Sequence, residues 1–119
     1  MKKQLKLVEE FHNKFKSPVL GRPSLIPEDR SNFRYTLMKG EVEEYEGGVK
    51  NKDLENIAKE LADILYATYG TILEHGLQDR IEEIFEEVHN SNMSKDYGEY
   101  KAVKGPNYFR ANVKKILDK

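Results

Sequence analysis

The sequence contains no cysteine among its 119 residues. This absence excludes disulfide bonds, zinc sites built on cysteine and catalysis by a thiol. An excess of charge of either sign is also missing, because 20 Lys and Arg residues stand against 21 Asp and Glu residues for a net charge of −1. Such a balance argues against a surface that binds nucleic acid polymers and against a polybasic patch that binds membranes.

Long hydrophobic runs are missing as well. Lys2, Lys3 and Lys6 interrupt the amino terminus before a signal-peptide core can form, and no later run is long enough to span a bilayer. We therefore expect a cytoplasmic protein with no membrane partner. The length suits one domain over residues 1–119.

Apolar residues recur at three- and four-residue steps in four stretches, which is typical of amphipathic helices. Gly47-Gly48 is expected to end the second helix, Asn51 or Asp53 to cap the third, and Gly76 to follow its end. The expected helices cover residues 3–15, 27–45, 53–75 and 77–93.

No stretch shows the alternation of a β-strand, and residues 94–112 contain turn residues that suggest at most a short hairpin. Residues 112–117 suit a helical turn. The predicted fold class is all-α: about four helices in a bundle with a structured C-terminal tail. The third helix is apolar on nearly every side, so we expect a homo-oligomer, a dimer or a dimer of dimers, that covers this surface.

Asp63 is the unusual residue of the third helix. Its neighbours Leu61, Ile64 and Leu65 are apolar, and Glu60 lies three residues earlier on the same helix face. An unpaired carboxylate in such a helix is costly to remove from water. We expect compensation by a cation from elsewhere in the protein, by protonation, or by a divalent metal.

Two expected helices each carry an acidic pair at a three-residue step. The pairs are Glu41 with Glu44 and Glu60 with Asp63, and an antiparallel arrangement would bring all four together. Solvated acids on helix faces are the simplest interpretation of the glutamates alone. The matched spacing and the apolar surroundings of Asp63 favour a site for Mg²⁺, or for Mn²⁺. A metal held by carboxylates suits phosphoanhydride cleavage, in which it neutralises developing charge and orients an attacking water.

Arg30 and Arg34 lie on the same stripe of the second helix as the acids. We expect them to form salt bridges that orient the site rather than to contact substrate. His12 lies on an apolar helix face and is expected to be a core histidine with its hydrogen bonds satisfied.

The acidic pattern, Glu-x-x-Glu, fifteen residues and Glu-x-x-Asp, is followed at residues 88–95 by Val-His-x-Ser-Asn-Met-Ser-Lys. With this combination the chain resembles the all-α nucleotide pyrophosphohydrolases, which include MazG-like proteins and the phosphoribosyl-ATP pyrophosphohydrolase-like group. The resemblance implies Mg²⁺-dependent hydrolysis of a nucleoside triphosphate between the α and β phosphates, giving the monophosphate and pyrophosphate. It implies catalytic metal ligands at Glu41, Glu44, Glu60 and Asp63, and nucleotide-binding residues at Asn92 and Lys95.

The chain departs from the family at Gly40, where relatives commonly carry the first of two adjacent glutamates. If that acid activates water or holds a second metal, this chain is a slower enzyme or binds fewer ions. Two alternatives therefore stay open. One is a non-catalytic helical module that binds nucleotide or a partner protein, and the other is hydrolysis of phosphoribosyl-ATP.

Overall fold

The computed structural model describes residues 1–119 as an all-helical chain without a β-strand. The helices are α1 (Lys2–Phe15), α2 (Glu28–Lys50), α3 (Leu54–Glu74), α4 (Ile81–Met93) and the short α5 (Val113–Leu117). This confirms the predicted all-α class with four main helices and a structured tail. No helix combines the length and apolar character that a membrane span requires. The chain divides into two compact units, residues 1–78 and 79–119, which are described separately, and the single domain stays a prediction.

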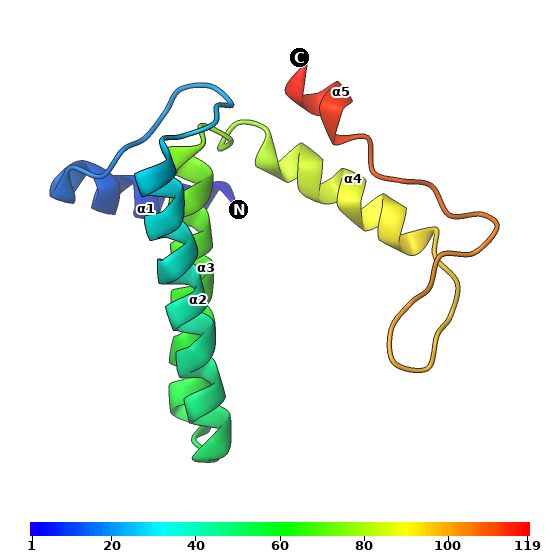
Figure 1. The fold of residues 1–119 in the computed structure, drawn as a ribbon, viewed down its shortest axis with the longest axis horizontal. Helices are drawn as coiled ribbons and strands as arrows, with labels where there is room; N and C mark the ends of the chain where they lie inside the picture. The colour runs from blue at the N-terminus through cyan, green and yellow to red at the C-terminus, as the bar shows by residue number, and fades with distance from the viewer. The chain divides into compact units, whose positions relative to one another are not determined.

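Helices α2 and α3 pack side by side as an antiparallel hairpin, the main packing of the first unit (Figure 1). Three residues, Asn51 to Asp53, connect them. Asp53, one of the two caps predicted for α3, caps the helix, because its Oδ1 accepts a hydrogen bond of 3.1 Å from the Asn56 backbone N–H. This short turn fixes which faces of the two helices meet.

The predicted end of α2 at Gly47-Gly48 is wrong, since the helix continues through both glycines to Lys50. Gly48 is buried against the start of α3, and a Cβ on it would lie 3.0 Å from Asn56 Nδ2 and 3.2 Å from Ile57 Cγ1. The missing side chain therefore allows two helices to approach closely instead of ending one of them.

Helix α1 packs against the C-terminal half of α3. Leu5 and Val8 are buried in this contact, while the rings of Phe11 and Tyr66 meet edge to face with centroids 5.5 Å apart. The helix ends at Lys16, whose φ of 61° is left-handed. These bounds agree with the predicted first helix.

Residues 17–27 form an ordered connection that is tied to the end of α3. The Leu20 N–H donates to Leu73 O at 3.0 Å, and the Ser24 N–H donates to His75 O at 2.9 Å. Gly76 has a φ of 66°, and a Cβ there would lie 2.0 Å from Arg22 O. The chain thus satisfies carbonyl groups that the end of a helix leaves free.

In the second unit, α4 begins at Ile81 rather than at the predicted Leu77. The Leu77 N–H donates to Ile72 O at 3.0 Å across the left-handed Gly76, a bond typical of a Schellman cap. Leu77 therefore belongs to the end of α3 and cannot start a new helix.

The tail after α4 is structured, as predicted. The expected hairpin reduces to one antiparallel bridge between Asp96 and Val103. Ser91 donates from its Oγ to Phe109 O at 2.8 Å, and Asn112 caps α5. These bonds hold the tail along α4.

Candidate active site

The α2–α3 hairpin brings the two acidic pairs together. One oxygen from each of Glu41, Glu44, Glu60 and Asp63 can be chosen so that all four lie within 4.8 Å of one another. The antiparallel arrangement predicted from the spacing is confirmed. That these side chains bind metal stays a prediction.

Glu60 is the buried member of the cluster, with 5% of its surface exposed. Its Oε2 and the Oε2 of Glu41 are buried and accept no hydrogen bond. Burial of its carboxyl group is the main cause that raises the pKa of Glu60, followed by the neighbouring Glu44 carboxyl, while the Lys59 charge acts in the opposite direction. Buried polar atoms without partners are rare, and a hard divalent cation is a partner that carboxylate oxygens suit.

Asp63 is not the buried charge that its apolar neighbours suggest. Its side chain is one-third exposed, and Lys59 Nζ, one turn earlier on α3, lies 2.9 Å from Asp63 Oδ2. The same Nζ lies 3.7 Å from Glu60 Oε1. The charge that needs compensation is therefore Glu60, and Lys59 is a site residue that the sequence reasoning missed, although its i,i+4 spacing from Asp63 is a visible signal.

Arg30 and Arg34 form salt bridges, as predicted, but with a residue that the sequence reasoning missed. Glu74 is 1% exposed and accepts from Arg30 Nη2 at 2.7 Å and from Arg34 Nη1 at 3.1 Å. Arg34 also donates from Nη2 to Ala67 O at 2.8 Å and from Nε to Thr71 Oγ1 at 3.1 Å. Glu74 lies fourteen residues after Glu60, which is close to four helical turns, so both residues lie on the face of α3 that meets α2. This spacing is the signal in the sequence that could have identified Glu74.

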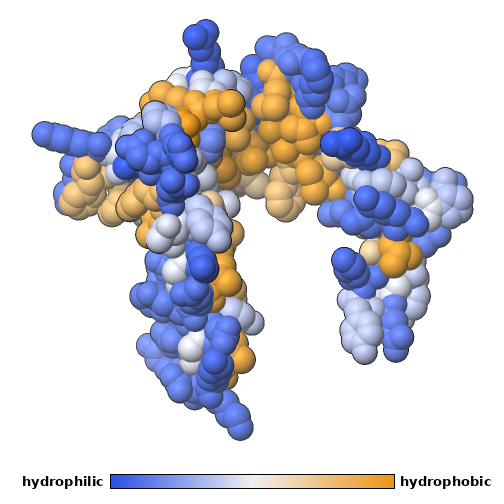
Figure 2. Space-filling view, viewed as in Figure 1, coloured by the Kyte–Doolittle hydropathy of each residue, from blue (hydrophilic) through white to orange (hydrophobic).

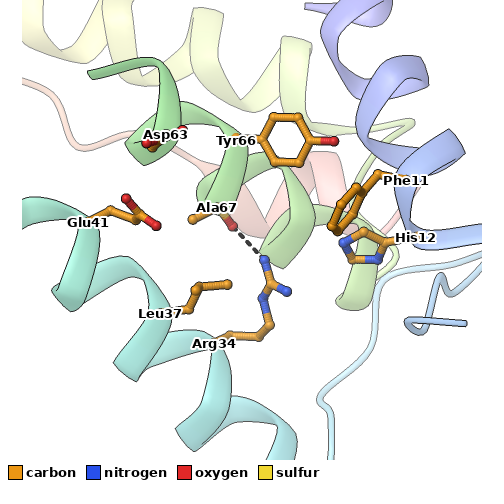
Figure 3. Close-up of a pocket in the computed structure, with 8 residues that line it drawn as sticks. All are labelled: Phe11, His12, Arg34, Leu37, Glu41, Asp63, Tyr66 and Ala67. Carbon is orange, nitrogen blue, oxygen red and sulfur yellow. Dashed lines mark hydrogen bonds between the residues drawn. The ribbon is translucent and has the colours of Figure 1, made fainter. Parts of the chain in front are cut away.

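A pocket of about 180 Å³ adjoins the acidic cluster (Figure 3). Two of the four acids stand at one side of the pocket and two side chains of α1 at the other, with the Arg34 guanidinium group between them. Both apolar and polar side chains line it: Phe11, His12, Arg34, Leu37, Glu41, Asp63, Tyr66 and Ala67. Burial raises the pKa of the Tyr66 hydroxyl, so this group stays protonated and neutral.

His12 is 2% exposed, and its Nδ1 lies 3.0 Å from Pro18 O. The prediction of a buried histidine with a hydrogen bond is therefore confirmed. Gly40 has open space around the position of a Cβ. The fold would accept an acidic side chain there.

Asn92 and Lys95 belong to the second unit. Asn92 is exposed near the end of α4, and Lys95 follows that helix half-buried. Their contact with nucleotide stays a prediction.

Residues 8–92 match the sequence pattern of the phosphoribosyl-ATP pyrophosphohydrolase family, and this match covers more than half of the chain. The chain belongs to the phosphoribosyl-ATP pyrophosphohydrolase family. It is accordingly a hydrolase that acts on an acid anhydride, within the all-α pyrophosphohydrolases that the acidic motifs indicated. A comparison with curated proteins gave no match.

Proposed function

We propose that this family member hydrolyses a nucleoside triphosphate between its α and β phosphates, with Mg²⁺ or Mn²⁺ held by Glu41, Glu44, Glu60 and Asp63. The observation that carries the proposal is the convergence of four carboxylates within 4.8 Å, two of them with buried oxygens that lack any partner. A cytoplasmic location is part of the same proposal.

When bound, the cation supplies neutralisation of phosphate charge and activation of water. The side chains of the protein hold it and set its surroundings. Glu60 and Glu41 offer the buried oxygens, while Glu44 is exposed and the Asp63 side chain is one-third exposed. Lys59 balances part of the negative charge of the cluster, which lets the four acids coexist before the cation binds. We propose that Asn92 and Lys95 contact the nucleotide.

Asp63→Asn tests the role of the cluster. We expect this variant to fold and to lose pyrophosphate release from a panel of triphosphates with Mg²⁺, because it removes one anionic ligand. Asp53→Asn is a matched control, since it removes a charge from the same helix and asparagine caps helices as well as aspartate does. Pyrophosphate release that survives in Asp63→Asn would contradict the proposal.

Phosphoribosyl-ATP is a second candidate substrate, and the family match favours it. It requires cleavage of the same type of bond. Direct assay of phosphoribosyl-ATP beside the triphosphate panel, and growth rescue of an auxotroph that lacks this hydrolase, separate the two substrates.

We also propose that a second copy of the chain covers one face of the α2–α3 hairpin. Figure 2 shows hydrophobic residues in a line along this hairpin. We call this line the apolar stripe. Within each helix its residues recur at steps of three, four or seven, and each has at least a third of its surface exposed. They are Val42, Tyr45, Val49, Leu54, Leu61 and Leu65. Because both antiparallel helices contribute, the stripe can pair with itself about a two-fold axis, as isologous interfaces do.

A further inference from the structure

Lys59 is a cation that forms ion pairs with the acidic cluster while its side chain faces solvent. Its Nζ lies 2.9 Å from Asp63 Oδ2 and 3.7 Å from Glu60 Oε1, and 68% of the side chain is exposed. Resting on the proposed function, we propose that Lys59 changes partner when metal and substrate bind. It gives up Asp63 to the metal and binds the phosphate chain of the substrate.

The ammonium group of Lys59 has donors left for a ligand. It carries three N–H groups. One of them suits Asp63 Oδ2 at 2.9 Å, whereas the 3.7 Å to Glu60 Oε1 is too long for a hydrogen bond. The hydrogen bond with Asp63, followed by the charges of the nearby acids, raises the pKa of Lys59, so Nζ keeps its proton. A phosphate oxygen can therefore accept a charge-assisted hydrogen bond from it.

The charge of the cluster explains why a phosphate ligand needs a cation at this place. Four ionised carboxylates carry four negative charges, and one divalent ion neutralises two of them. The remaining negative charge repels a phosphate chain, which is itself an anion. Arg34 lines the neighbouring pocket, but Glu74 already balances its charge. Lys59 is then the cation that can attract the phosphate groups.

Two features favour a change of partner over a fixed ion pair with Asp63. The Oε2 atoms of Glu41 and Glu60 are buried without a partner, so a divalent ion that satisfies them carries its charge into the cluster. This charge repels the Lys59 ammonium group, which lies close to the same acids. The exposed four-carbon chain of Lys59 lets Nζ move while α3 stays in place, and an exposed pair of this kind is weak.

Lys59→Met tests both contacts, because it keeps a long side chain and removes the ammonium group. Calorimetric titration with Mn²⁺ alone should show an affinity that rises, by up to about fivefold, since no ion pair and no like charge then oppose the ion. Titration with inorganic triphosphate at saturating Mg²⁺ should show an affinity that falls about tenfold, since one charge-assisted hydrogen bond is lost. Inorganic triphosphate carries the phosphate chain without base or sugar, so neither measurement depends on which substrate is hydrolysed.

Lys50→Met is the matched control, because it removes the same charge from a similar ion pair. Lys50 Nζ lies 2.7 Å from Glu46 Oε1, also one helical turn away and exposed, but neither residue belongs to the cluster. Both affinities should equal those of the parent protein. Lys59→Arg keeps the charge and the donors, so it should keep the affinity for inorganic triphosphate.

The opposite signs of the two changes distinguish this role from a purely structural one. If Lys59→Met weakens the binding of both Mn²⁺ and inorganic triphosphate, Lys59 only orients Asp63 and the proposal is overturned. Unchanged binding of inorganic triphosphate would also overturn it, whatever happens to Mn²⁺. A parent protein that binds no Mn²⁺ would instead refute the proposed metal site, a result that is obtained before any variant is made.

Discussion

Replacing Glu74 by glutamine removes the negative charge that holds two arginines between α2 and α3. Glu74 is 1% exposed and accepts three hydrogen bonds, from Arg30 Nε at 2.9 Å, Arg30 Nη2 at 2.7 Å and Arg34 Nη1 at 3.1 Å. Glutamine keeps the shape but has one oxygen and no charge. Arg34, 5% exposed, then remains as a buried cation without a counter-charge.

The expected loss is about 3–5 kcal/mol in the free energy of unfolding, the usual cost of removing one partner of a buried ion pair. This is a large part of the roughly 5–15 kcal/mol that stabilises a typical domain. Arg30 adds little to the loss, because its side chain is 31% exposed and can be hydrated. The double variant Arg34→Met with Glu74→Leu should recover most of the stability, since an apolar pair of similar volume avoids the desolvation of both charges.

Urea unfolding followed by circular dichroism, at one fixed protein concentration, measures these differences. A double-mutant cycle gives the interaction energy of Arg34 with Glu74. Glu46→Gln is the control, because it breaks the exposed Glu46–Lys50 pair and should change nothing measurable. A loss below about 1 kcal/mol for Glu74→Gln would refute the reasoning, since it is the value of an exposed pair.

Two further predictions concern the acidic cluster and the apolar stripe. The pKa of Glu60 is raised by burial above the ordinary 4.5, so without metal the folded protein loses stability as pH rises through that raised pKa. Mg²⁺ binds the ionised acid, so its increase of Tm should grow as pH rises through the raised pKa of Glu60 and should lose this pH dependence in Glu60→Gln. An increase that is constant with pH would contradict the metal site. Leu61→Asp, which places a charge in the apolar stripe, should convert the proposed dimer to a monomer in light scattering. Leu25→Asp is the control and should leave the dimer intact, because Leu25 is 95% exposed and lies outside the stripe. A parent protein that is monomeric at micromolar concentration would end the proposal.

The sequence allowed prediction of features that depend on local spacing. Helices α1 and α3 have nearly the predicted bounds, and Asp53, which caps α3, was one of the two residues predicted to do so. The acidic pairs meet because each has a three-residue step and the connection is short. These properties depend on the helix repeat alone.

Features that depend on the partner element could not be predicted. Gly48 was expected to end a helix because glycine often does so, but its role is set by Ile57 on the facing helix. Leu77 fits the periodicity of α4, yet its N–H belongs to the cap of α3. In each case a tertiary contact overrides the local preference.

Burial was also assigned to the wrong acid. Asp63 has apolar neighbours in sequence, and these lie on other faces of α3, whereas Glu60 faces α2 and is buried. Neighbours along the chain describe the surroundings of a helical residue poorly, because adjacent residues point about 100° apart. The register of α2 against α3 decides which carboxylate is buried when the protein folds.

The connection of residues 17–27 has a consequence for how a substrate would enter. Its N–H groups of Leu20 and Ser24 donate to Leu73 O and His75 O at the end of α3, so the segment that follows α1 is tied to the same helix that α1 packs against. The α1 wall of the pocket is therefore anchored to α3 twice, by its own packing and by the segment that follows it. A ligand meets a recess whose shape exists in advance, and little conformational entropy is lost when it binds.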